Sequence, residues 1–170
     1  MDSALLLALL ASCAPAIHHD TARALVRVES STNPWAIGVV HNELRRQPRS
    51  RSEAMATARL LRAQGHDFSV GLAQINQRNF ARLGLTLEAA FDPCANLAAM
   101  QRLLAECFER AQRGHRADLQ QSLRRALSCY YSGNFTTGFR DGYVSKVAAA
   151  AGPARGIARN SRPRFAPSHS

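Results

Sequence analysis

The strongest constraint on this chain is a carboxylate that falls on the apolar face of a short helix. Four residues recur there at three- and four-residue spacing: Ala22, Leu25, Val26 and Glu29. A helix through this segment places them on one face, which is apolar except for Glu29. The helix must end soon afterwards, because Asn33 precedes Pro34 and a residue before proline is pushed out of the α region. Glu29 is therefore expected on the last turn of a helix, beside a loop that can admit a ligand.

Two interpretations of Glu29 follow from this position. Burial penalises the charged form of a carboxyl group and raises its pKa, so a buried Glu29 could hold its proton near neutral pH and give it to a leaving oxygen. The alternative is a structural glutamate that reaches solvent at the helix end or pairs with Arg27 or a more distant base. The choice between them depends on the motifs further along the chain.

Composition and charge narrow the class of protein. With 170 residues, 46% of them hydrophobic and 20% charged, the chain is expected to form one globular domain. The net charge of +10 indicates an acidic partner, such as an anionic polymer or a membrane surface. The basic residues are scattered and form no DNA- or RNA-binding motif, so nucleic acid is not the expected partner. The histidines and cysteines have no metal-ligand spacing, and no metal or cofactor is expected.

Helices dominate the predicted secondary structure. Ser50 and Glu53 have the spacing of a capping box and predict a helix over 53–64, whereas the chain from Phe68 begins extended. Further helices are predicted from apolar periodicity and from Gly or Pro at the helix ends. They cover 77–83, 96–113, 118–130 and 142–151, with a short turn between Thr86 and Asp92.

Four cysteines permit two disulfides in an oxidising compartment: Cys13, Cys94, Cys107 and Cys129. Cys94 lies at the start of the helix predicted over 96–113, so the helical rise puts it roughly 20 Å from Cys107, beyond disulfide reach. This excludes Cys94–Cys107 and, with it, Cys13–Cys129. Two patterns stay open: Cys13–Cys94 with Cys107–Cys129, or Cys13–Cys107 with Cys94–Cys129. The other alternative is four reduced, buried cysteines.

The two ends of the chain differ from its middle. Residues 1–12 are interpreted as a signal segment or a first helix, because an apolar run precedes the cleavage-like Ala14-Pro15-Ala16, and Leu10-Ala11-Ser12-Cys13 resembles a lipoprotein box. An apolar run of about eight residues is too short to span a bilayer, so no stable transmembrane anchor is expected. Residues 13–151 are assigned to the folded domain. Residues 152–170, rich in Pro, Arg and Ser, are expected to form a disordered basic tail.

Three motifs carry a family resemblance. In chain order they are Val28-Glu29-Ser30, Gly71-Leu72-Ala73-Gln74-Ile75-Asn76, and Ala126-Leu127-Ser128-Cys129-Tyr130-Tyr131-Ser132-Gly133-Asn134 with Tyr143-Val144 following. Together they resemble the lytic transglycosylases with a goose-type lysozyme fold. The closest likeness is to the specialised peptidoglycan lyases of type IV secretion and conjugation systems, and it covers roughly residues 13–150.

The resemblance implies one mainly helical, lysozyme-like domain, α+β at most, with a substrate groove. Glu29 would match the catalytic acid, which protonates the glycosidic oxygen between N-acetylmuramic acid and N-acetylglucosamine. As a base it would then take the proton of the muramyl C6 hydroxyl and leave a 1,6-anhydro product. The implied substrate-binding residues are Ser30, Gln74, Asn76, Tyr130 and Tyr143. The family usually has Asn where this chain has Tyr131, so the resemblance does not predict the sugar contact at this position.

The implied function is local opening of the murein wall for assembly of a secretion or conjugation apparatus. Peptidoglycan glycan strands would be the substrate, other secretion-system subunits would be further partners, and the protein would be periplasmic or exported. The motifs contain no second acid, and Asp67 and Asp92 are expected in a turn and at a helix boundary, which favours a lyase. The alternatives are a lysozyme-type hydrolase and a catalytically weak murein-binding scaffold protein. Asn76 could also act only as a helix cap.

Overall fold

The computed structural model describes residues 1–113 and 118–152, and most of these are helical, as the sequence predicts. The helices are α1 (Ser3–Cys13), α2 (His19–Ser30), α3 (Arg51–Ala63), α4 (Phe80–Leu83), α5 (Leu87–Ala90), α6 (Pro93–Arg113), α7 (Leu119–Ser132), α8 (Thr137–Arg140) and α9 (Tyr143–Ala151), with a 3₁₀ turn η1 (Gln77–Asn79). The strands are β1 (Ile37–Val39), β2 (Phe68–Val70) and β3 (Ile75–Asn76). The tail predicted from residue 152 lies, after Gly152, outside the described residues.

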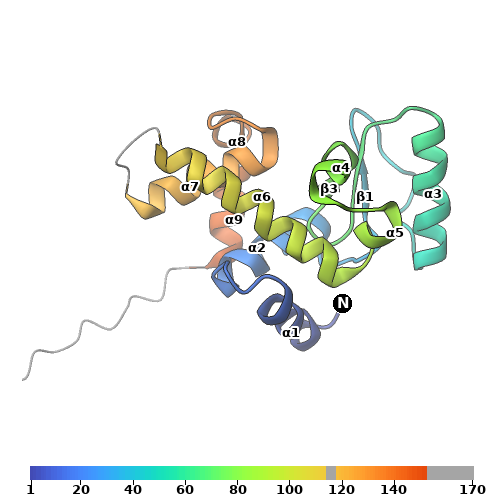
Figure 1. Ribbon diagram of the computed structural model, residues 1–170, viewed down its shortest axis with the longest axis horizontal. Coiled ribbons are helices and arrows are strands. Elements are labelled where there is room, and N and C mark those ends of the chain that lie inside the picture. The colour runs from blue at the N-terminus through green and yellow to red at the C-terminus, as the bar shows by residue number, and fades with distance from the viewer. Residues whose placement is uncertain (114–117, 153–170) are drawn as a thin grey trace, which may run out of the picture.

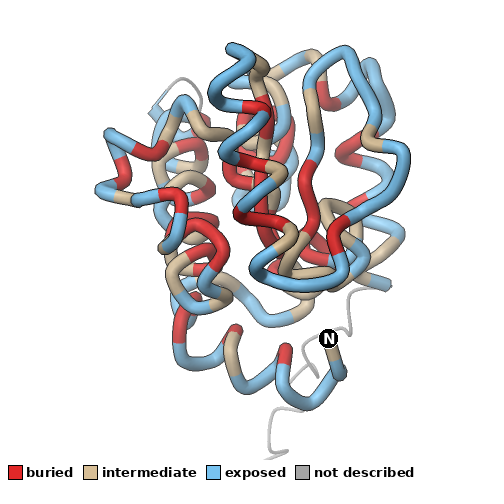
Figure 2. The backbone as a smooth tube through the Cα atoms, turned by 90° about the vertical axis from the view of Figure 1, so that its right-hand side faces the viewer, coloured by how far each residue is buried: buried red, intermediate tan, exposed pale blue. Residues whose placement is uncertain are grey.

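Helix α6 runs through the middle of the molecule (Figure 1). The sheet lies at one end of the molecule with α3, α4 and α5, and α7 and α8 lie at the other. One stripe of α6 is buried throughout its length: Asn96, Leu97, Ala99, Met100, Leu104, Cys107 and Ala111. The buried stretches of the backbone gather mainly toward the middle of the molecule, and the outer turns are mostly exposed (Figure 2). The fold therefore has a single core built around α6, as expected for one domain.

Two helices begin two or three residues earlier than predicted. Helix α6 begins at Pro93, because proline fits the first turn of a helix and the Asp92 carboxylate accepts a hydrogen bond from the Ala95 amide at 2.8 Å. Helix α3 begins at Arg51, after an N-cap at Ser50 whose hydroxyl accepts from the Glu53 amide at 3.2 Å. Only this half of the predicted capping box is formed. The Glu53 carboxylate accepts from the amide of Arg49 instead of Ser50.

The sheet is antiparallel, in the order β1-β2-β3. Val70 of β2 pairs with Ile37 of β1 on one side and with Ile75 of β3 on the other, and all three side chains are buried. The extended start at Phe68 is confirmed, whereas β1 and β3 were not predicted. Strands of two or three residues are too short to display the alternation by which a strand is recognised in a sequence.

Helices α2 and α9 pack against each other and bring two distant parts of the chain together. Helix α2 ends at Ser30, as predicted, and Ser31 follows in the left-handed conformation with φ 51°. Helix α9 begins at Tyr143, directly after Gly142, whose φ is 76°. The short α8, which the sequence analysis did not predict, connects α7 to α9.

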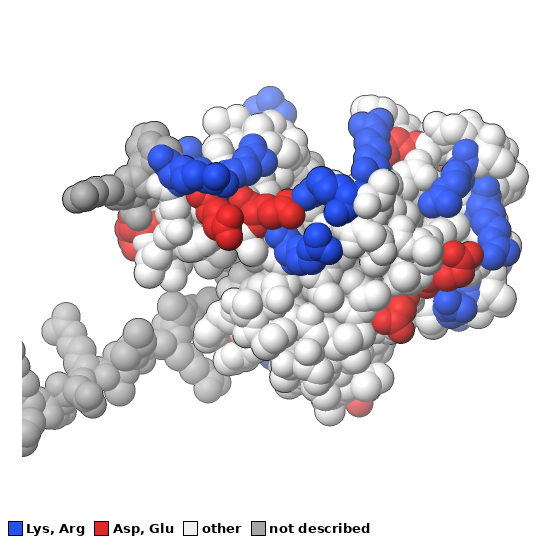
Figure 3. Space-filling view, viewed as in Figure 1, with Lys and Arg blue, Asp and Glu red and all other residues white. Residues whose placement is uncertain are grey.

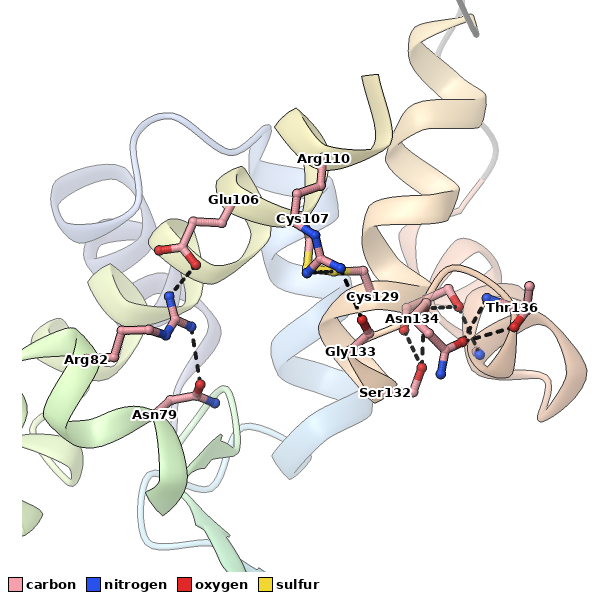
Figure 4. The surroundings of a disulfide bond; sticks show 12 residues. Asn79, Arg82, Glu106, Cys107, Arg110, Cys129, Ser132, Gly133, Asn134 and Thr136 are labelled. Carbon is pink, nitrogen blue, oxygen red and sulfur yellow. Dashed lines mark hydrogen bonds and ion pairs between the residues drawn. A yellow bond between two sulfur atoms is a disulfide. The ribbon is translucent and has the colours of Figure 1, made fainter. Parts of the chain in front are cut away.

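Two disulfides join Cys13 to Cys94 and Cys107 to Cys129. This confirms one of the two patterns left open and shows that the alternative of four reduced cysteines is wrong. The first bond fastens α1, whose Leu6 and Leu10 are buried, to the start of α6. The second joins α6 to α7, and beside it the Arg110 guanidinium donates to the Gly133 carbonyl at 3.3 Å (Figure 4). No helix among the described residues is long and apolar enough to cross a membrane.

Peptide mapping without reduction should recover only these two cystine pairs. Replacing Cys13 and Cys94 by serine should destabilise the fold more than replacing Cys107 and Cys129, because the first bond closes a loop of 81 residues and the second one of 22. Loop-closure entropy gives losses of about 4.5 and about 3.4 kcal/mol. Denaturant unfolding of the two double variants checks this order, and a peptide linking Cys13 to Cys107 would contradict the pairing.

Candidate active site

Glu29 lies on the last turn of α2, as predicted, and its side chain turns toward α9. The Tyr143 hydroxyl donates a hydrogen bond to Glu29 Oε1 across a sequence separation of 114 residues. Among the described residues, the partner of Glu29 is thus this tyrosine, and no ion pair joins it to Arg27. Glu29 is half-buried, so its carboxyl group is enclosed by protein but keeps some contact with the surface.

Burial raises the pKa of Glu29 from its ordinary value of 4.5 to about 7. The hydrogen bond from Tyr143 and the positive charge of Lys146 act in the opposite direction, because both stabilise the carboxylate. No second carboxylate contributes to this pKa among the described residues. Glu29 is therefore held near the midpoint between acid and carboxylate at neutral pH, where a group can both give and take a proton.

Two tyrosines lie close enough to the carboxyl group to be affected by its charge. Burial, with the negative charge of Glu29, raises the pKa of Tyr143 and of Tyr130 well above the ordinary value, so both phenols stay neutral and act as donors. The Tyr130 hydroxyl donates to the Ala73 carbonyl at 2.6 Å. Tyr130 thereby ties the last turn of α7 to the connection between β2 and β3.

That connection, residues 71–74, is held in a fixed shape. Gln74 has a backbone φ of 47°, a conformation that residues other than glycine rarely adopt. Both hydrogens of its amide are used inside the protein, because Nε2 donates to the carbonyl oxygens of Ala36 at 3.1 Å and Gly71 at 3.0 Å. The side-chain oxygen of Gln74, Oε1, receives no hydrogen bond from the described residues. It is therefore the atom of this side chain that could accept a hydrogen bond from a ligand.

The side chain of Asn96, on α6, holds the same connection by hydrogen bonds. The sequence analysis did not predict this role. This side chain is 1% exposed. Its Oδ1 accepts from the Ala73 amide at 2.8 Å, and its Nδ2 donates to the carbonyls of Val70 at 3.0 Å and Ala90 at 2.8 Å. A Cβ at Gly71 would lie 2.3 Å from Nδ2, which explains the glycine. The sequence signal that could have revealed this role is an amide side chain on the apolar stripe of a helix, because a buried polar side chain must find hydrogen-bond partners.

Ser30 and Asn76 are engaged in local hydrogen bonds. Ser30 Oγ donates to the Val26 carbonyl of its own helix at 3.2 Å. Asn76 Oδ1 accepts from the Arg78 amide and caps η1, and its Nδ2 donates to Asp67 at 2.9 Å. The structure thus brings Glu29, Tyr130 and Tyr143 together and places Gln74 on the connection that Tyr130 contacts. The substrate-binding roles of all these residues stay predictions.

Tyr131, where the resemblance led us to expect Asn, stacks on Tyr143. The two ring centroids are 4.5 Å apart and the ring planes differ by 18°. Tyr131 is 47% exposed, whereas Tyr143 is 7% exposed. A surface hollow of about 430 Å³ lies just beyond the end of α2, where residues 31–35 line it together with Met1 and Leu5, but Glu29 is not among its lining residues.

One cluster of metal-ligand type occurs among the described residues, at the other end of α2. His18, His19 and Asp20 place one ligand atom each within 4.8 Å of one another. Their mutual contacts account for this arrangement, because the Asp20 carboxylate lies 3.8 Å from His18 Nδ1 and 3.4 Å from His19 Nε2. His18 Nδ1 also accepts from the Asp20 amide as the N-cap of α2.

The mainly helical domain, with a half-buried glutamate at a helix end, fits the lysozyme-like class that the sequence predicts. More specifically, the chain belongs to the family of the transglycosylase SLT domain, whose model matches residues 7–151. The predicted fold and family are thereby confirmed.

Named relatives narrow the comparison further. The chain is 47% identical over 150 residues to the "Type IV secretion system protein virB1" of Brucella abortus biovar 1 (strain 9-941) and, equally, to that of Brucella suis biovar 1 (strain 1330). These matches cover 85% of this chain and 63% of each relative. "Protein virB1" of Agrobacterium fabrum is 41% identical over 142 residues, which are 82% of this chain and 56% of the relative. The chain thus spans less than two thirds of the relatives' length. No solved structure matches.

The raised pKa of Glu29 predicts how stability depends on pH. Since the native pKa of about 7 exceeds the ordinary 4.5, the native state keeps its proton in a range where the unfolded chain loses it, and stability falls as pH rises through that range. Glu29→Gln cannot ionise and can still accept from Tyr143. It should therefore be more stable than the unmodified protein by on the order of 3 kcal/mol at pH 8, and by little at pH 4.

Denaturant unfolding at the two pH values measures this difference. The matched control is Glu109→Gln, which makes the same change at an exposed side chain. Equal effects of the two substitutions at pH 8 would contradict the burial of the Glu29 carboxyl group.

Proposed function

We propose that this domain is a peptidoglycan lytic transglycosylase that cleaves the bond between N-acetylmuramic acid and N-acetylglucosamine. The observation that carries the proposal is Glu29: a half-buried carboxyl group with a pKa of about 7, bonded to Tyr143, in a domain of the SLT family. Below this pKa, Glu29 holds the proton that a leaving glycosidic oxygen needs.

The reaction uses Glu29 twice. Its proton goes to the glycosidic oxygen as the bond from the muramyl C1 breaks, and the electron pair of that bond leaves with the oxygen. The carboxylate that remains takes the proton of the muramyl C6 hydroxyl, whose oxygen closes on C1. Glu29 ends protonated again and no water is consumed, so the product carries a 1,6-anhydro ring.

Tyr143 suits this change of role. Because its hydroxyl donates to Oε1, the proton of the acid form is confined to Oε2, which fixes the oxygen that acts as donor. When Glu29 is a carboxylate the same hydrogen bond stabilises the negative charge. Tyr130 stays neutral beside Glu29 and fixes the connection that carries Gln74.

A lyase is favoured over a hydrolase because, among the described residues, the two acids nearest the motifs, Asp67 and Asp92, are both engaged in structural contacts. Asp67 accepts from Asn76 and pairs with Arg78 at 2.9 Å, and Asp92 caps α6. Without an activated water, the nearest nucleophile is the C6 hydroxyl of the same sugar, which is held at high effective concentration. The hydrolase and the catalytically weak scaffold protein are the alternatives that the product analysis below separates.

The same proposal covers the substrate contacts. The Gln74 carbonyl oxygen and the Ser30 hydroxyl oxygen would accept hydrogen bonds from the amide and hydroxyl groups of the sugars. Asn76 would shape the wall of the site through its bonds to Asp67 and η1. Tyr130 and Tyr143 would pack beside the sugar at the scissile bond.

The cellular role that we infer is local opening of the murein wall for a secretion or conjugation apparatus, in the periplasm or outside the cell. It rests on the name of the Brucella relatives, "Type IV secretion system protein virB1". Other secretion-system subunits would be partners. The net charge of +10 suits an acidic wall polymer, and Lys and Arg lie in several separate groups, beside Asp and Glu, on the face drawn in Figure 3.

Glu29→Gln should abolish clearing of purified murein while the protein stays folded, because the amide is nearly isosteric but has no proton to give. Turbidity measurement with a circular dichroism control tests this, and Glu109→Gln should clear murein at the rate of the unmodified protein. Mass analysis should find products lighter than hydrolysis products by one water, with no new reducing ends. Undiminished clearing by folded Glu29→Gln would end the assignment, and hydrated muramyl ends would favour the hydrolase.

Tyr143→Phe should move the alkaline limit of activity upward. The hydrogen bond from Tyr143 lowers the pKa of Glu29, so its loss leaves a pKa above 7 and keeps the acid form to a higher pH, by about one pH unit. The maximal rate should fall, because the carboxylate needed for the second half of the reaction is less stable. A pH–rate profile measures both effects. A limit that stays in place or moves downward would be incompatible with this role.

A further inference from the structure

Tyr131 is a large aromatic side chain left exposed beside the candidate active site. It lies in the last turn of α7, next to Tyr130, whose hydroxyl points inward to the Ala73 carbonyl. Exposed apolar side chains that occur singly are common and carry no meaning by themselves. Such residues are present elsewhere among the described residues: Leu5, Leu7, Val40, Leu60, Leu119 and Phe139.

Tyr131 differs from these residues in what it contacts. One of its faces is stacked on the Tyr143 ring, with centroids 4.5 Å apart and planes within 18° of parallel. The Tyr143 hydroxyl in turn donates to Glu29 Oε1. The two rings therefore form a ledge with Glu29 at its inner end and the exposed part of Tyr131 at its outer end.

The chemistry of this ledge fits a sugar ring. A pyranose has one face made largely of C–H groups, which is apolar and slightly positive, and an aromatic ring has a negative face and a positive edge. Stacking buries both apolar faces while the hydroxyl groups at the rim of the sugar stay in water. Tyr131 is already held against Tyr143, so little side-chain entropy is lost when a ligand packs on its open side.

We infer that Tyr131 is a sugar-binding platform, on which a pyranose ring of the glycan strand stacks beside the bond that Glu29 cleaves. This inference rests on the proposed function and adds a contact to it.

The test compares the binding of purified murein by three variants, each in the Glu29→Gln background so that nothing is cleaved. Tyr131→Ala should weaken co-sedimentation with murein about 2- to 10-fold, the range expected for one aromatic stack. Tyr131→Phe keeps the ring and should lose less than Tyr131→Ala. Leu119→Ala is the matched control, because it removes an exposed apolar side chain from the same helix, roughly 18 Å away. It should bind as the Glu29→Gln parent does.

A second substrate separates sugar from peptide. Glycan strands stripped of their peptides by an amidase should show the same loss with Tyr131→Ala, and a loss confined to peptide-bearing murein would overturn the inference. Equal binding by Tyr131→Ala and Leu119→Ala would also overturn it. So would a shift in the pH–rate profile of Tyr131→Ala, with Glu29 intact, that leaves affinity unchanged, because Tyr131 would then act only by positioning Tyr143.

Clearing by the protein with Glu29 intact is measured separately. If that protein binds murein without clearing it, the lyase assignment fails while the binding comparison still decides the role of Tyr131. Binding to neither form of the polymer would overturn both.

Discussion

The chemistry of this protein depends on two opposing effects on one carboxyl group. Burial of the Glu29 side chain, where α2 packs against α9, favours the neutral acid. The hydrogen bond from Tyr143 favours the carboxylate. Neither effect alone would suit a group that must give a proton and then take one back. Full burial without a donor would hold Glu29 protonated, and a donor without burial would hold it ionised. Their sum leaves the pKa at about 7.

Most of the surrounding structure serves to hold the groups that produce this balance. The packing of α2 on α9 sets the distance between Glu29 and Tyr143. Asn96 of α6 fixes the connection between β2 and β3, and Tyr130 joins that connection to α7. The Cys107–Cys129 bond then joins α7 to α6, so the two supports of the connection are covalently linked. The site is thus built by rigid elements that share one core, and this is what precise proton transfer requires.

Periodicity was enough to predict the helices, because a long amphipathic segment repeats its pattern several times. The short helix over 77–83 and the turn after Thr86 were also predicted, from glycine, proline and capping residues, but the start of α6 and three short elements were missed. Helix α6 begins at Pro93 because the Asp92 side chain supplies a cap, a local interaction that leaves the apolar stripe unchanged. Strands β1 and β3 and helix α8 are too short to repeat any pattern. Two glycines did mark helix boundaries: Gly133 follows the last residue of α7, and Gly142 precedes the first residue of α9. Both have left-handed backbone conformations.

The sequence by itself determined that Glu29 ends an apolar helical face, and that Cys94 cannot pair with Cys107, because both follow from the rise and period of a single helix. Only the tertiary structure decided which of the two remaining disulfide patterns is formed. It also decided that the side chains of Gln74 and Asn76 form most of their hydrogen bonds within the protein, and that the ring of Tyr131 stacks on that of Tyr143. These contacts join segments whose separation in the chain carries no periodic signal. The packing of whole elements against one another brings them together, and local sequence patterns do not encode that packing.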